Sequence, residues 1–106
     1  MTQYLFSVHY GQDNEDVLDL LMGHYVIDVK GARIFAMHAI DTLDDVKSVD
    51  VAVRDIHGGR RIIGTVYYRG NGINRTYIWL RAGDKTAYAV RKDGTVDKGA
   101  PFGIRE

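Results

Sequence analysis

Several stretches of the chain alternate apolar and polar residues with a period of two, which is the spacing of strands that bury one face. Residues 3–10 begin this pattern, with Tyr4, Phe6 and Val8 on one side. Residues 48–54 repeat it with valines at alternate positions. The chain is therefore expected to be rich in strands.

One stretch has helical spacing instead. Over residues 14–22, Val17, Leu20 and Leu21 stand at i, i+3 and i+4 and give one apolar face. Asp13 or Asn14 can cap the first turn of such a helix. This segment is the predicted main helix.

The β-branched content rises after that helix. We expect a hairpin there, with strands over residues 25–30 and 33–40 and a turn at residues 30–31. Thr42 can then cap a short helical turn that ends at Val46.

The second half of the chain has the pattern of a meander. Strand-like runs cover residues 48–54, 60–69, 74–81 and 86–92, and turn signals follow them at residues 57–59, 70–72, 83–84 and 93–94. Short runs separated by glycine-containing turns favour antiparallel pairing. The tail over residues 97–106 contains the only proline, Pro101, and is expected to be irregular.

Together these elements predict an α+β fold: a mainly antiparallel sheet of about five to seven strands, with a meander in the C-terminal half, packed against one main helix. A length of 106 residues without repeats or linkers indicates a single domain over residues 1–106. The expected core residues are Val17, Leu20, Leu21, Val49, Val51, Val53, Ile78 and Leu80.

Composition narrows the possible functions mainly by exclusion. The chain has no cysteine, which excludes disulfides, thiolate zinc sites and cysteine nucleophiles. The N-terminus lacks the basic region of a signal peptide, and no run approaches the roughly 18 apolar residues of a membrane span. We therefore expect a cytoplasmic protein that does not associate with membranes.

Charge is balanced overall but divided between the two halves. Residues 1–53 contain nine acidic and three basic residues, and residues 54–106 contain five acidic and eleven basic residues. The halves therefore carry net charges of −6 and +6. Residues 54–81 hold six arginines and no lysine. Arginine favours planar, bidentate recognition of carboxylate or phosphate, although pairing with acids of the first half explains the same set.

Arginines and aromatic residues interleave along residues 60–69 and 74–81. One pairing of these strands places both sets on a shared face, whose members are Arg61, Tyr67, Arg69, Arg75, Tyr77, Trp79 and Arg81. A register slip of one residue would send Trp79 to the core. The shared face could stack the bases of single-stranded nucleic acid or form a hot spot for a protein partner.

The sequence contains no recognisable catalytic motif. The four histidines, His9, His24, His38 and His57, show none of the common metal-ligand spacings, and neither serine lies in a GxSxG motif. We expect no catalytic residue, no metal site and no cofactor. If His9, His24 or His38 met a carboxylate in a deep cleft, an acid–base role would return.

The opening segment, Met1-Thr2-Gln3-Tyr4-Leu5-Phe6-Ser7-Val8-His9-Tyr10, resembles the first strand of YCII-related proteins, which are small ferredoxin-like α+β dimers. The resemblance implies a histidine-dependent enzymatic activity, with His9 at the matching position. It covers only these ten residues. The Asp-Gly-Pro-Phe signature common in that family is absent, so the chain is not assigned to the family.

The function expected from the sequence is a small non-catalytic binding module, an inhibitor or adaptor of the kind found among small phage-like proteins. Its first-choice partner is a protein with an acidic surface, docked on the arginine–aromatic face. RNA or single-stranded DNA is the alternative partner, and zero net charge counts against it. A YCII-like enzyme is a further alternative. The divided charge also favours self-association, including a homodimer.

Overall fold

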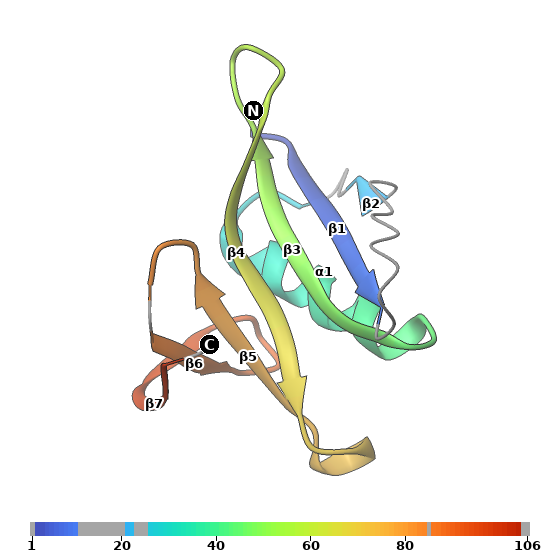
Figure 1. Cartoon of the computed structure of the whole chain (residues 1–106), viewed down its shortest axis with the longest axis vertical. Helices are drawn as coiled ribbons and strands as arrows, with labels where there is room; N and C mark the ends of the chain where they lie inside the picture. Colours follow the sequence, from blue (N-terminus) through green and yellow to red (C-terminus); the bar gives the residue numbers. More distant parts are fainter. Residues whose placement is uncertain (1, 11–20, 23–25, 85, 105–106) are drawn as a thin grey trace.

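The computed structural model describes residues 2–10, 21–22, 26–84 and 86–104. These residues form one seven-stranded sheet, in the order β2-β1-β3-β4-β5-β6-β7, and a single α-helix (Figure 1). The elements are β1 (Tyr4–Tyr10), β2 (Leu21–Met22), α1 (Val29–Thr42), β3 (Val46–Arg54), β4 (Arg60–Arg69), a 3-10 turn (Gly72–Asn74), β5 (Thr76–Arg81), β6 (Thr86–Val90) and β7 (Val96–Ile104). Every strand pair is antiparallel, which confirms the predicted α+β fold with its C-terminal meander.

The main helix lies elsewhere in the sequence than predicted. α1 occupies most of the segment expected to form a hairpin over residues 25–30 and 33–40, so that prediction is wrong. Asp28 caps the helix, because its carboxylate accepts a hydrogen bond from the Gly31 amide at 2.7 Å. The buried positions follow helical spacing: Ala32, Ala36, Met37, Ala39 and Ile40.

The helix predicted over residues 14–22 falls largely outside the described residues. Its last two positions, Leu21–Met22, form the short strand β2, which pairs with Leu5 and Phe6 of β1. The sheet therefore extends beyond β1 where the sequence pattern indicated the end of a helix.

Two smaller expectations are also wrong. The helical turn expected over residues 42–46 is not formed, because α1 ends at Thr42 and β3 begins at Val46 after a turn in which Asp45 has a φ of 62°. The tail expected to be irregular forms the edge strand β7, where Pro101 lies opposite Tyr88. An edge strand tolerates proline because one of its sides needs no donor.

Cross-strand register gives the sheet two distinct faces. Val8, Val49, Val66 and Trp79 lie opposite one another along one row, and all four are buried in the cluster that α1 completes. Each fully buried valine contributes about 1.5–3 kcal/mol relative to an exposed one. Figure 1 shows α1 lying along this face of β1, β3 and β4.

The expected core is found where its side chains are described. Three of its members are completely buried: Val49, Val51 and Ile78. Two are half-buried: Val53 and Leu80. The three members from residues 14–22 lie outside the described side chains. Ile78 is buried on the face that α1 does not cover, because it lies beside Trp79 in β5 and strand neighbours point to opposite faces.

Candidate functional site

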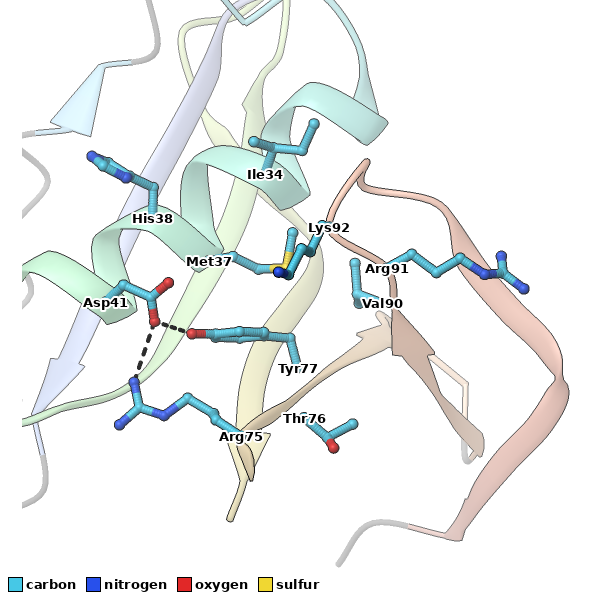
Figure 2. Close-up of a pocket in the computed structure, with 10 residues that line it drawn as sticks. All are labelled: Ile34, Met37, His38, Asp41, Arg75, Thr76, Tyr77, Val90, Arg91 and Lys92. Carbon is cyan, nitrogen blue, oxygen red and sulfur yellow. Dashed lines mark hydrogen bonds and ion pairs between the residues drawn. The ribbon is translucent and has the colours of Figure 1, made fainter. Parts of the chain in front are cut away.

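A groove of about 500 Å³ lies between α1 and the strands β5 and β6 (Figure 2). Met37 and Val90 form its buried apolar floor, and Ile34 adds a more exposed apolar wall from α1. This volume falls within the range of about 300–1,000 Å³ that is typical of ligand sites. The groove can therefore take an apolar side chain or a small organic group.

At one end of the groove, the carboxylate of Asp41 accepts hydrogen bonds from two other side chains of the groove. The hydroxyl of Tyr77 donates a hydrogen bond to Oδ1 of Asp41, in the last turn of α1. Arg75 donates from Nη1 to the same oxygen at 3.3 Å (Figure 2). The Arg75 guanidinium also lies over the ring of Tyr68, 4.1 Å from its centroid. Arg75 and Tyr77 thus converge on one carboxylate oxygen of Asp41.

Most of the charged residues that line the groove are basic. Arg75, Arg91 and Lys92 line it together with His38, and Asp41 is the one acidic residue among the described residues of the lining. The Arg91 side chain points away from the groove in Figure 2, and its Nη2 lies 3.5 Å from Asp97. Arg75 and Lys92 remain as the cations of the groove itself.

The face predicted from the arginine–aromatic pattern is divided between the two sides of the sheet. Tyr77 and Trp79 of β5 both point to the side of the sheet that faces α1. They lie opposite Tyr68 and Val66 of β4. Tyr67 lies opposite Ile78, on the other side of the sheet. Arg69 lies opposite Thr76, on that same side. The expectation that both strands present these residues together is therefore wrong.

The individual residues of that predicted face differ in exposure. Trp79 is only 4% exposed and lies beneath the Arg33 guanidinium, 4.9 Å from the ring centroid. Arg61 is exposed near the start of β4, opposite Val53. Arg81 is exposed at the end of β5, with its Nε 3.6 Å from Asp84. Of the seven predicted binding residues, Arg75 and Tyr77 line the groove.

A second polar cluster lies on the face of the sheet away from α1. Nε2 of His9 on β1 lies 2.7 Å from Oδ2 of Asp50 on β3. The hydroxyl of Thr65 on β4 donates to Oδ1 of the same carboxylate at 2.7 Å. The side chains of His9 and Asp50 are 33% and 20% exposed. This arrangement fixes the orientation of the imidazole.

Both clusters contain residues that the sequence did not single out. Met37 and Asp41 were missed because residues 33–40 were predicted as a strand of a hairpin, and His38 was considered only for its spacing to other histidines and for an acid–base role. The helical spacing of buried positions from Ala32 to Ile40 is the signal that identifies them. The contact between His9 and Asp50 joins residues 41 positions apart, and local spacing cannot detect it.

Comparison with known proteins adds no family to this description. No protein-family model matches the chain, and neither does any curated protein or solved structure. Among the described residues, no group of three or more potential ligands could hold a metal ion. No helix in the same part of the chain is long and apolar enough to cross a membrane.

Proposed function

We propose that the protein is a non-catalytic binding module whose groove between α1 and β5 takes an acidic, partly apolar segment of a partner protein. The observation that carries this proposal is the convergence of Arg75 and Tyr77 on one carboxylate beside an apolar floor. Arginine and tyrosine are the residue types that most often dominate protein–protein binding energy.

The partner's carboxylate would enter at the end of the groove now filled by Asp41. The Asp41 side chain is about half exposed, so a competing carboxylate can reach Arg75 without unfolding the helix. Lys92 supplies a second positive charge, and Met37 and Val90 receive an apolar neighbour of the acidic residue.

Three observations favour a protein over RNA or single-stranded DNA. Trp79 is buried, and Tyr67 and Tyr77 are half-buried, so an exposed stacking platform is not formed by these rings. The arginines of the predicted face lie on different parts of the sheet. The net charge of zero lacks the basic excess of dedicated nucleic-acid binders.

A displayed library of short random peptides tests the proposal. We expect selected peptides to combine aspartate or glutamate with apolar residues, and Lys92→Glu to weaken their binding at least about tenfold by charge reversal. Lys47→Glu is the matched control, because Lys47 is exposed on β3 and does not line the groove. Selection without acidic enrichment, or equal binding by both variants, would overturn the proposal.

Capture of partners from lysates with and without nuclease distinguishes a protein partner from RNA or single-stranded DNA. Capture that disappears with nuclease and falls steeply with salt would identify a nucleic acid instead. Light scattering across the same salt series would detect self-association as a competing use of the divided charge.

An acid–base enzyme is the second candidate function, and the hydrogen bond between His9 and Asp50 favours it. A histidine oriented by a carboxylate is a common general base. The test is a screen for turnover that His9→Ala abolishes while the protein stays folded. His57→Ala is the matched control, because His57 lies in the exposed turn between β3 and β4.

A further inference from the structure

A second cavity lies on the α1 side of the sheet, outside the groove described above. It has a volume of about 230 Å³ and is bounded by α1, β5, β6 and β7. Its lining residues with charged or aromatic side chains are Arg33, Trp79, Arg81, Asp84, Tyr88 and Lys98. None of these residues lines the groove between α1 and β5. The cavity is smaller than the usual site for a drug-sized ligand.

The charges around this cavity do not cancel. Among the described residues that line it, Asp84 is the only acidic one, and Nε of Arg81 lies 3.6 Å from its carboxylate. Arg33 from α1 and Lys98 from β7 also line the cavity. The Asp28 carboxylate at the start of α1 offsets part of the charge of Arg33, so Asp28 and Asp84 together oppose three cations, which are Arg33, Arg81 and Lys98. A positive charge therefore remains at the cavity.

Arg33 is held rigidly but is incompletely hydrogen-bonded. Its guanidinium stacks on Trp79, and Nη1 donates to the Gly94 carbonyl oxygen at 2.9 Å. Nε is buried and has no hydrogen-bond partner within the described residues. Burial removes part of the hydration of the guanidinium and lowers the pKa of Arg33. A partly dehydrated cation gains more from a charged acceptor than a fully solvated one does.

We propose that this cavity is a binding site for a phosphate group, held between Arg33 and Lys98 beside the ring of Trp79. Phosphate fits the arrangement better than carboxylate because it offers three or more acceptor oxygens and up to two negative charges to donors from different elements. The cavity takes a single such group, either inorganic phosphate or the phosphate of a small monoester.

The test uses the fluorescence of Trp79, the only tryptophan in the chain. Inorganic phosphate and glycerol phosphate are titrated separately into the full chain at constant ionic strength, with sodium chloride and acetate as comparison salts. We expect a saturable change with at least one of the two phosphates and none with chloride. Tighter binding of glycerol phosphate would indicate a monoester, and equal or weaker binding would indicate free phosphate.

Two substitutions connect the signal to the cavity. Lys98→Gln should raise the apparent Kd about tenfold, as expected for the loss of one charge-assisted hydrogen bond. Lys98 is exposed on β7, so this variant is expected to fold even if Arg33→Gln does not. Lys92→Gln, in the separate groove, should leave the Kd unchanged. A signal that does not saturate, or that Lys98→Gln leaves unchanged, would overturn the phosphate site without affecting the proposed peptide groove.

Discussion

Val66 on β4 lies directly opposite Trp79 on β5, and this pairing turns the indole toward α1. The two residues belong to one buried row across the sheet, so every second residue of β5 also faces the helix side. Tyr77 follows Trp79 to that side, whereas Tyr67, next to Val66, points the opposite way. One register relationship thus decides which aromatic residues can reach a ligand together.

Gly64 is expected to be essential for this packing. A Cβ atom at Gly64 would collide with the six-membered ring of Trp79. Gly64→Ala should therefore lower the free energy of unfolding by about 1–3 kcal/mol through overpacking, measured by urea denaturation. Trp79→Leu should reduce the penalty of Gly64→Ala, because the smaller side chain leaves room.

Gly99→Ala on β7 is the matched control for that experiment. Its added Cβ would meet only the Asp97 carboxylate at an ordinary distance of 3.4 Å, so the free energy of unfolding should change by less than about 0.5 kcal/mol. Equal effects of the two glycine substitutions would contradict the proposed contact between position 64 and the indole.

Asp41 is expected to compete with an acidic ligand for Arg75 and Tyr77. Asp41→Asn removes the negative charge that now occupies this end of the groove. An acidic peptide should then bind more tightly, by about threefold to tenfold, since an exposed ion pair is worth up to about 1 kcal/mol. Isothermal titration calorimetry measures the change, and weaker binding by a folded variant would contradict this role.

The sequence predicted the second half of the fold far better than the first. The turns at residues 57–59, 70–72, 83–84 and 93–94 were identified because local glycine chemistry determines them, and several of these glycines have positive φ. The hairpin expected before residue 42 was wrong because Gly31 was interpreted as a turn. In the structure its amide completes the Asp28 cap of α1.

The candidate site was less accessible to sequence reasoning for a different physical reason. The alternation within β5 was predicted correctly, but which side faces the helix depends on a register that no local pattern specifies. The contacts of Asp41 with Arg75 and Tyr77 span more than 30 residues. They depend on a helix that was predicted as a strand.

The turn between β6 and β7 should show a pH-dependent contribution to stability. The hydroxyl and the amide of Thr95 donate to Oδ1 of Asp93, at 2.6 and 3.0 Å, and these bonds lower the pKa of that carboxyl. The folded-state pKa is thus below the unfolded value of about 3.9. The stabilisation is therefore fully present above the unfolded value and is lost as the pH falls through the folded-state pKa.

Thr95→Val tests this assignment because it removes the hydroxyl, which is the largest cause of the shift. Carbon-detected NMR titration should show a higher pKa for Asp93 in this variant, and Thr95→Ser should retain the low value. An unchanged pKa in folded Thr95→Val would mean that the hydroxyl does not hold the carboxylate.

Asp50 is expected to tie three strands together on the face away from α1. Its carboxylate accepts from Thr65 and lies 2.7 Å from the His9 imidazole, so Asp50→Ala leaves two polar groups without their acceptor. We expect a loss of about 1–3 kcal/mol in the free energy of unfolding. His9→Ala alone should cost less, because Asp50 keeps its bond from Thr65.

A double-mutant cycle for His9→Ala and Asp50→Ala, measured by urea denaturation, should give a coupling of at least about 0.5 kcal/mol. Strict additivity of the two substitutions would show that the contact contributes nothing to stability.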